Sequence, residues 1–275
     1  MASLPEGVAV AAGAEAGARA SKESARERQD QILRQLRSSP FVSVSELVQN
    51  LGVSDMTIRR DLKTLSARGE VNVVHGGASL PYGTPGTVDF SRRAKKLSEA
   101  KRKIAQAAQA YIPERGVIAV DAGTTAFAVI HEMSPEFRGT VISHSIPVLQ
   151  HMLSMPNARV LGLGGELLIE SQALVGPRAV EGLAGLKAAV LFLGAAAVDA
   201  DGVYVATDME RPVKMALIDS ASLVVLVADH EKFSGSAAVR LVDFSAIDVV
   251  LTDAPPRQDV SLRLKAAGTE VVVCR

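Results

Sequence analysis

Three cations lie close together in the stretch GVSDMTIRRDLKTL, residues 52–65, and their spacing suits contact with a polyanion. Ile58, Leu62 and Leu65 recur at the interval that buries one face of an α-helix, so the charged side chains point away from the core. An outward arginine can fork onto atoms O6 and N7 of guanine or clamp a phosphate. The stretch therefore predicts a helix that presents its cations to a nucleic acid.

The elements around this helix decide whether its cations meet a partner. Two helical patterns precede it, one beginning at Glu23 and one at the capping-box pair Ser43 and Glu46; Ser54 is the predicted N-cap of the third. The run VNVVHGGASLP, residues 71–81, then predicts a small hairpin with its turn at HGG. Three short helices followed by a hairpin indicate a winged helix-turn-helix, in which the third helix enters the major groove of DNA.

Burial of the apolar face turns Thr57, Arg60 and Lys63 outward and places Met56 and Arg59 on the flank. The first turn of the helix also offers backbone N–H groups to a phosphate, and the wing glycines let the backbone approach DNA. The alternative is a solvated surface, with Arg59 paired to the aspartate four residues earlier. The residues predicted to contact DNA are Ser54, Met56, Thr57, Arg59, Arg60, Lys63, His75 and Gly76.

Charge separates the two ends of the chain although the formal net charge is zero. Residues 1–103 hold 17 Lys and Arg against 11 Asp and Glu, whereas residues 104–275 hold 13 against 19. A basic front portion and an acidic rear portion indicate that only the front meets a polyanion. No run approaches the roughly 20 apolar residues of a membrane span, so we expect no membrane partner.

The stretch SVSELVQNLGVSDMTIRRDLKTLSARGEVNVVHGGA resembles the N-terminal domain of the DeoR family of bacterial transcriptional regulators. Members of that family carry a V-S-x-x-T-I-R-R-D-L recognition helix followed by an HGG wing. The resemblance implies a double-stranded DNA operator as partner. The single cysteine, Cys274, allows no internal disulfide and no cysteine metal cluster, which fits a reducing cytoplasm. We expect no cofactor and no metal.

Beyond the front domain, short β-branched runs alternate with helical patterns. The runs are VIAVD, TVISH, RVLGLGG, AVLFLG, LVVLVAD, DVVLTD and EVVVC. Strands of this kind separated by helices indicate an α/β fold with a mostly parallel sheet covered on both faces. The predicted organisation is a disordered extension at 1–22, a winged helix-turn-helix at 23–81, a linker at 82–97 and an effector domain at 98–275.

A phosphate site is predicted where the strand VIAVD meets the next helix, in the turn DAGTT at residues 121–125. Gly123 permits a tight turn, and the N–H groups and hydroxyls of Thr124 and Thr125 converge at a helix N-terminus, a geometry that receives a phosphate. Many such turns use Gly and Thr only as turn and cap, and the residues alone leave that alternative open. Ligands in open parallel sheets bind beyond the carboxyl ends of the strands. Further candidates at such ends, or at the start of a helix, are Ser143, His144, Gly165, Glu166, Glu210, Lys214, Asp229 and Lys232.

Taken in order, DAGTT, LGGELL, ALVGPRA, MERPVKMALI, ADHEKF and DVVLTDA resemble the effector domain of the same DeoR family. That domain is similar in fold to ribose-5-phosphate isomerase and binds phosphorylated sugars or related metabolites. The resemblance implies that the turn from Asp121 to Thr125 holds the phosphate. The residues it implies around the sugar are Glu210, Lys214, Asp229 and Lys232.

Two positions depart from the family pattern. His144 stands where members commonly have Asn, so a contact to a ligand hydroxyl is in doubt at this point. The imidazole could introduce pH sensitivity near neutrality, or it could be a packed histidine with satisfied ring nitrogens. Glu231 precedes Lys232 and Phe233 where many members have S-K-F.

Two functions remain open from the residues. The first is a DNA-binding transcriptional regulator, usually a repressor in this family, that controls a carbohydrate catabolic operon and responds to a phosphorylated sugar. Because paired half-sites need at least a dimer, this function implies a homo-oligomer, either a dimer or a tetramer. The second is an isomerase-like enzyme with Glu210 or Asp121 as general base and Lys214 as charge stabiliser. A helix-turn-helix is superfluous to that chemistry, so we predict the regulator.

Overall fold

The computed structural model describes residues 25–36, 41–74, 76–80, 90–96 and 98–275. The predicted N-terminal extension, the wing residue His75 and most of the predicted linker lie outside these ranges.

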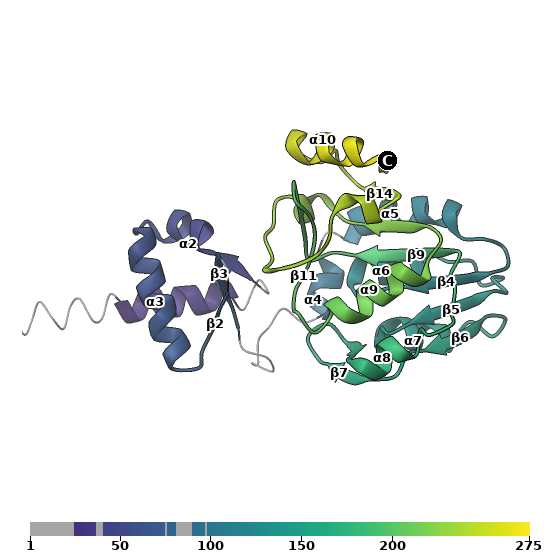
Figure 1. Cartoon of the computed structure of the whole chain (residues 1–275), viewed down its shortest axis with the longest axis horizontal. Coiled ribbons are helices and arrows are strands. Elements are labelled where there is room, and N and C mark those ends of the chain that lie inside the picture. Colours follow the sequence, from purple (N-terminus) through teal and green to yellow (C-terminus); the bar gives the residue numbers. More distant parts are fainter. Residues whose placement is uncertain (1–24, 37–40, 75, 81–89, 97) are drawn as a thin grey trace, which may run out of the picture. The chain divides into compact units, whose positions relative to one another are not determined.

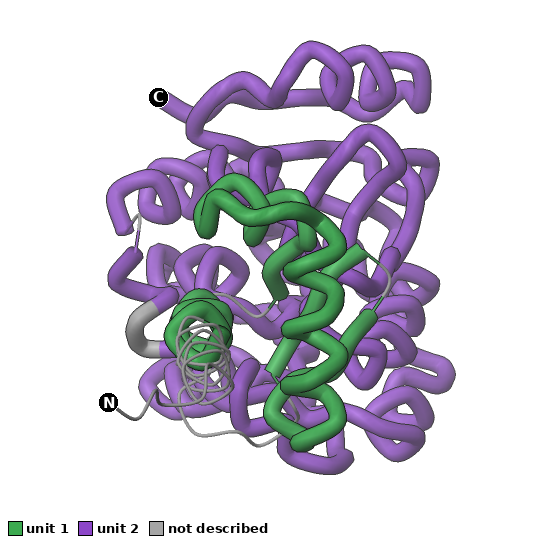
Figure 2. Tube along the Cα trace, turned by 90° about the vertical axis from the view of Figure 1, so that its left-hand side faces the viewer, with its two compact units in different colours: residues 1–87 green, residues 88–275 purple. Residues whose placement is uncertain are grey.

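The chain divides into two compact units, Met1–Thr87 and Val88–Arg275, which Figure 2 colours separately. Of the predicted linker at 82–97, residues Phe90–Lys95 form helix α4 and belong to the second unit.

In its described residues, the first unit holds three helices and a small antiparallel sheet (Figure 1). Its elements are a helix at residues 25–36, β1 (Val42–Ser43), α2 (Val44–Leu51), α3 (Asp55–Ala67), β2 (Asn72–Val74) and β3 (Gly77–Ser79). Strand β3 pairs with β1 on one side and with β2 on the other. The predicted winged helix-turn-helix is therefore confirmed, with β2 and β3 as the wing strands.

Local capping sets the boundaries of the two helices in the turn motif. Ser43 and Glu46 form the predicted capping box at the start of α2. Gly52 ends α2 with φ 65°, a left-handed conformation that glycine adopts without strain. The Ser54 hydroxyl caps α3 by accepting from the N–H of Thr57. Apolar side chains from all three helices then close the core; they are Ile32, Leu36, Leu47, Ile58, Leu62 and Leu65, each at most 1% exposed.

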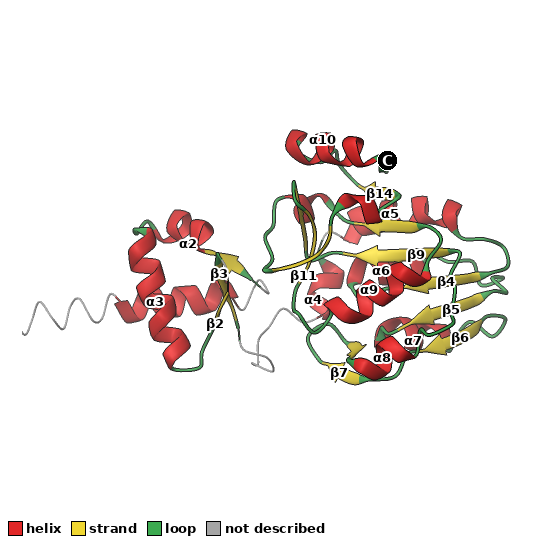
Figure 3. Cartoon of the chain, viewed as in Figure 1, coloured by secondary structure: helices red, strands yellow, loops and turns green. Residues whose placement is uncertain are grey.

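The second unit is built on one seven-stranded sheet whose strands all run parallel (Figure 3). The strands in spatial order are β15 (Glu270–Val273), β14 (Val249–Thr252), β12 (Val224–Val227), β9 (Val190–Gly194), β4 (Val117–Val120), β5 (Thr140–Ser143) and β6 (Arg159–Gly162). Each corresponds to one predicted apolar run, so the predicted α/β architecture is confirmed.

Side chains alternate between two hydrophobic clusters on the two faces of this sheet. In β4, Ile118 and Val120 point to one cluster and Ala119 to the other, the two-residue period of a strand buried on both sides. The first cluster is completed by α5 (Ser98–Ala108), α6 (Thr124–His131) and α7 (Ile146–Met152). The second is completed by α8 (Pro177–Glu181), α9 (Arg211–Ser220) and α10 (Gln258–Ala267).

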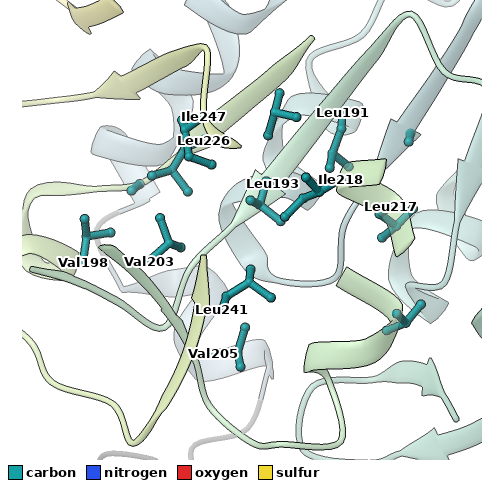
Figure 4. Close-up of a cluster of buried hydrophobic side chains, with 14 of the residues drawn as sticks. Leu191, Leu193, Val198, Val203, Val205, Leu217, Ile218, Leu226, Leu241 and Ile247 are labelled. Atoms are coloured by element: carbon teal, nitrogen blue, oxygen red, sulfur yellow. The ribbon is translucent and has the colours of Figure 1, made fainter. Parts of the chain in front are cut away.

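Several short elements were not predicted. Strands β10 (Ala197–Asp199), β11 (Gly202–Val205) and β13 (Val239–Val242) form an antiparallel sheet. Figure 4 shows its side chains Val198, Val203, Val205 and Leu241 packed near Leu191, Leu193 and Leu226 of the main sheet. Strands β7 (Glu166–Leu168) and β8 (Ala173–Val175) form a hairpin. Three 3-10 turns complete the unit: η1 (Gln109–Tyr111), η2 (His230–Phe233) and η3 (Phe244–Ala246).

Among the helices in the described ranges, none has the length and apolar character needed to cross a bilayer. The described residues likewise contain no group of three or more His, Cys, Asp or Glu side chains placed to hold a metal ion.

Candidate functional site

The exposed side of α3 carries an apolar residue and three cations. Met56 is 72% exposed, and Arg59, Arg60 and Lys63 are also exposed. Thr57 differs from the prediction: it is half-buried, and its hydroxyl lies 2.9 Å from the Ser54 hydroxyl, within the cap of the helix. The surface that α3 offers to a partner therefore consists of Met56, Arg59, Arg60 and Lys63, and Thr57 is less exposed than these side chains.

Arg59 forms the ion pair that the sequence left open. Its Nε lies 2.5 Å from Asp55 Oδ1, and its Nη2 lies 3.3 Å from Asp55 Oδ2. The carboxylate raises the pKa of Arg59, through the hydrogen bond first and through its charge second. Both side chains remain more than half exposed. A groove of about 490 Å³ beside this pair is lined by Arg59 and Lys63 on α3 and by Val73 and Val74 on β2.

Asp61 ties α3 to the first helix, a role that the sequence reading missed. Only 3% exposed, it accepts hydrogen bonds from Arg28 Nε at 2.5 Å and from Gln29 Nε2 at 2.9 Å. Arg68 Nη1 then donates to Gln29 Oε1 at 3.2 Å. The signal in the sequence was a charged residue on the buried face of an amphipathic helix, because such a charge needs a partner.

In the second unit, strand β4 lies at the point where the sheet reverses its order. The chain passes from β4 to β5 and β6 on one side and later adds β9, β12, β14 and β15 on the other. Ligands of open α/β sheets bind outside the carboxyl ends of the strands at such a switch point. The DAGTT turn follows β4 there, and Gly123, with φ 127°, leads directly into α6.

Asp121, the first residue of this turn, has hydrogen-bond partners on both carboxylate oxygens. Lys214 Nζ lies 2.5 Å from Oδ2, the backbone N–H of Gly194 donates to Oδ2 at 2.9 Å, and His144 Nε2 lies 2.9 Å from Oδ1. Asp121, His144 and Lys214 are 0%, 0% and 4% exposed. Burial alone would raise the pKa of Asp121, but Lys214 and His144 outweigh it and hold that pKa below the ordinary 3.8.

Glu210 and Lys214 have separate partners in the structure. Lys214 was predicted to face a ligand together with Glu210, four residues earlier, but its ammonium meets Asp121 instead. Glu210, 6% exposed, accepts from the backbone N–H of Ala206 at 3.3 Å. The buried ion pair therefore joins α9 to the end of β4, and the Gly194 N–H joins β9 to the same carboxylate.

His144 joins the turn to the β7–β8 hairpin. Its Nδ1 lies 3.0 Å from the carbonyl oxygen of Leu174, and its Nε2 also lies 3.1 Å from the backbone N of Ala122. The backbone N–H of Leu174 donates to the carbonyl of His144 at 2.7 Å. With both ring nitrogens in contact with polar groups and no exposed surface, His144 has the packed arrangement that was one of its two predicted alternatives.

The other predicted effector residues differ in how far solvent reaches them. Thr124 and Thr125, at the start of α6, are 8% and 5% exposed, and Ser143 is buried with its hydroxyl donating to the carbonyl of Val120 at 2.7 Å. Gly165 and Glu166 are exposed at the start of the β7–β8 hairpin. Within the described part of the chain, neither Gly165 nor Glu166 forms a hydrogen bond or an ion pair with the DAGTT turn.

Asp229 and Lys232 share their surroundings with Lys101, a further residue that the sequence reading missed. Asp229 is 2% exposed, and its Oδ1 has no hydrogen-bond partner among the described residues. Burial lowers the pKa of Lys101 to about 8; the charge of Asp229 opposes this shift, and those of Lys232 and Arg93 add to it. Burial likewise lowers the pKa of Lys232.

Helix α4 is bonded to this group. Lys101 Nζ donates to the carbonyl of Arg93 at 2.6 Å and to that of Lys96, so the ammonium caps the C-terminus of α4. Lys96 Nζ lies 2.5 Å from Glu231 Oε2 in η2. The ring of Phe90, at the start of α4, packs edge-on against Phe127 of α6 at 5.9 Å. Helix α4 thus contacts both the helix that follows DAGTT and the turn that follows Asp229.

Two family profiles cover most of the chain. A DeoR-like helix-turn-helix domain matches residues 28–83, and a DeoR C terminal sensor domain matches residues 96–254. The chain belongs to the DeoR family. Within this DeoR-family protein, the first match covers the helix-turn-helix that presents the cations of α3, and the second covers the DAGTT turn and all strands of the parallel sheet except β15. It is a DNA-binding transcriptional regulator, as its curated relatives are, and not an enzyme.

Relatives match the DeoR chain over most of its length. A protein of Escherichia coli (strain K12) named glycerol-3-phosphate regulon repressor is 30% identical over 249 residues, which cover 90% of this chain and 98% of the relative. The transcriptional repressor GlcR of Bacillus subtilis (strain 168) is 28% identical over 247 residues, 90% of this chain and 95% of the relative.

Solved structures resemble the DeoR chain only distantly. Ribose 5 phosphate isomerase A from Neisseria gonorrhoeae gives a TM-score of 0.36 at 17% identity, covering 48% of this chain and 52% of that one. A probable sor operon regulator from Shigella flexneri gives 0.37 at 12% identity, covering 61% and 90%. Likenesses of this degree carry no argument about function.

Proposed function

We propose that this DeoR-family chain represses a carbohydrate catabolic operon and that a phosphorylated sugar bound at the DAGTT turn changes its affinity for the operator. The observation that carries the proposal is the place of this turn: it lies at the carboxyl end of β4, where the sheet order reverses, and it opens directly into α6. Positive backbone N–H groups at a helix start favour a phosphate.

Charge in the second unit supports an anionic ligand. Because Asp121 is already bound to Lys214, His144 and Gly194, its charge is largely compensated and repels a phosphate little. At the end of β12, burial lowers the pKa values of Lys101 and Lys232 beside Asp229, and a negative charge bound next to these lysines would stabilise their charged forms. A phosphate is the ligand group that supplies such a charge.

The route from ligand to DNA runs, in this proposal, through α4. Effector-dependent DNA affinity requires a structural element whose equilibrium both sites influence. Helix α4 follows the connector to the helix-turn-helix in the chain, and Lys101 caps it by donating to Arg93 and Lys96. A ligand that changes the field at Lys232 therefore also changes the interaction that holds α4.

Operator recognition, in the same proposal, uses the exposed row Met56, Arg59, Arg60 and Lys63, together with Ser54 and Gly76; His75 lies outside the described residues. Arg60 is exposed on the row. It is the residue that we assign to a base edge or phosphate in the major groove. A specific site built from paired half-sites needs two such helices, so the regulator works as a homo-oligomer, a dimer or tetramer, on chromosomal DNA in the cytoplasm.

The experiment measures binding of the full chain to DNA fragments from upstream of its own gene, by fluorescence anisotropy at fixed salt. Sugar phosphates are added one at a time; glycerol 3-phosphate, named for a relative, is the first. We expect one of them to shift the operator Kd at least tenfold. The paired variant Thr124→Val, Thr125→Val keeps side-chain shape, so it should keep operator affinity and lose this shift. An unchanged shift in that variant would place the phosphate elsewhere.

A second variant tests the DNA face. Arg60→Ala should weaken operator binding by roughly 1–3 kcal/mol if the side chain forks onto a base. Effector binding, followed as a rise in Tm on ligand addition, should be unchanged in this variant. Wild-type operator affinity in Arg60→Ala would show that the arginine faces water in the complex.

A further inference from the structure

The carboxylate of Asp55 occupies one edge of the Arg59 guanidinium and leaves another edge free. Asp55 accepts from Nε at 2.5 Å and from Nη2 at 3.3 Å, a side-on fork. A guanidinium has five N–H donors in one plane, and its Nη1–Nη2 end can make a second fork of the same kind. With the side edge filled, this end edge is what Arg59 can offer to a partner.

The free edge belongs to the face of α3 that we propose to bind DNA. Arg59 is exposed on α3 together with Met56, Arg60 and Lys63, and it lines the groove between α3 and wing strand β2. In a winged helix-turn-helix, α3 is the helix that enters the major groove. Guanine displays two acceptors there, O6 and N7, at the spacing of a guanidinium fork.

The charge of the pair argues for a base and against a phosphate as the partner. The positive charge of Arg59 is offset by the carboxylate beside it, so its attraction for a phosphate is reduced. Acceptors on a base edge carry no net charge, and a planar fork recognises them by geometry. Because the ion pair with Asp55 already restricts the rotamers of Arg59, this side chain loses less conformational entropy when it binds.

We infer that Asp55 is a specificity-determining residue for operator recognition, which positions Arg59 so that its Nη1–Nη2 edge reads one guanine. Asp55 acts through Arg59 and does not itself touch the DNA. The inference rests on DNA binding by α3 and requires no effector, so it stands or falls separately from the sugar-phosphate site.

If the Asp55–Arg59 ion pair were only structural, removal of the Asp55 carboxylate would change operator affinity in the opposite direction. Removing a carboxylate near DNA makes the protein surface more positive and raises affinity for every DNA sequence. Loss of a positioning residue instead lowers affinity for the operator, although affinity for unrelated DNA still rises. The ratio of operator to unrelated-DNA affinity separates the two.

The experiment selects DNA ligands from a random duplex library with the full chain and with Asp55→Asn, Arg59→Ala and the double variant. Kd values are then measured on the selected operator and on a scrambled duplex at the same salt. For Asp55→Asn we expect the preference for guanine at one position to fall about two- to tenfold. Arg59→Ala should lose the same preference, and adding Asp55→Asn to it should change nothing further at that position.

Asp30→Asn is the matched control, because Asp30 is exposed on the first helix and the substitution removes the same charge from the same unit. It should leave base preference unchanged. Circular dichroism melts establish that Asp55→Asn folds; the Ser54 cap does not depend on the carboxylate. Equal gains in affinity for operator and scrambled DNA in Asp55→Asn would overturn the inference. An equal loss on both would assign Arg59 to a phosphate and overturn it as well.

Discussion

Lys214 Nζ lies 2.5 Å from Asp121 Oδ2, although 93 positions separate the two residues in the chain. The contact is buried, and it joins the start of α9 to the first residue of the DAGTT turn, at the carboxyl end of β4. Because each ion is buried and needs the other to compensate its lost hydration, the pair fixes the position of the turn.

Lys214→Met should destabilise the protein by roughly 3–5 kcal/mol, because the substitution removes the ammonium and leaves the Asp121 carboxylate buried without its cationic partner. Urea unfolding of the full chain, followed by circular dichroism, measures the change. Lys187 is exposed, and Lys187→Met should stay within about 0.5 kcal/mol of wild type. Similar stabilities for the two variants would mean that the buried pair does not hold the fold.

Asp121 should also make stability depend on acid pH. Its pKa is lower in the folded protein than the ordinary 3.8, so its contribution is fully present above about pH 4 and is lost as pH falls through the folded value. Asp121→Asn removes this titration, so its free energy of unfolding should fall less steeply with acid than that of wild type. Urea titrations at several pH values below about 5 test this. Asp219→Asn, at an exposed position, should keep the wild-type slope.

Lys101 should give a pH dependence on the alkaline side. Its pKa falls from 10.5 to about 8 on folding, so between these values the unfolded chain binds a proton that the folded chain has released. This term therefore raises stability as pH increases from about 8 to 10.5. Lys101→Met should lack it. Tyr204, whose pKa is raised to about 12, and other groups also titrate at alkaline pH, so the informative quantity is the difference between wild type and variant.

The difference in unfolding free energy between wild type and Lys101→Met should therefore change between pH 7 and pH 10. A constant difference would mean that folding does not lower the pKa of Lys101. Lys265→Met, at an exposed position, provides the baseline for removal of a lysine.

Asp61→Ala should destabilise the first unit and weaken DNA binding. The substitution removes the acceptor of Arg28 and Gln29, and a buried pair that loses one partner costs about 3 kcal/mol. Asp30→Ala, at an exposed site on the same helix as Arg28, should be nearly neutral. The measurement is hydrogen exchange of α3 amides together with operator Kd. Wild-type protection of α3 in Asp61→Ala would contradict the assigned role of the carboxylate.

The amino-acid sequence by itself determined the elements that depend on local patterns. Ser43 with Glu46 and Ser54 specify helix starts through their own hydroxyls, and Gly52 specifies a helix end through its backbone freedom. The five central apolar runs specify strands buried on both faces, because each of these runs is too uniformly apolar to leave a face in water, whereas the edge strands β6 and β15 are partly exposed. These signals act within a few residues, and they also placed DAGTT at a strand end.

Only the tertiary structure decided which polar residues meet. The i,i+4 spacing of Glu210 and Lys214 suggested a shared surface, yet both side chains are buried and bind different partners: Lys214 meets Asp121, and Glu210 accepts from the backbone of Ala206. Asp61 and Lys101 likewise have their partners on other elements, at Arg28 and at the carbonyls of α4. No local rule encodes such pairs, since each depends on the desolvation that packing itself creates.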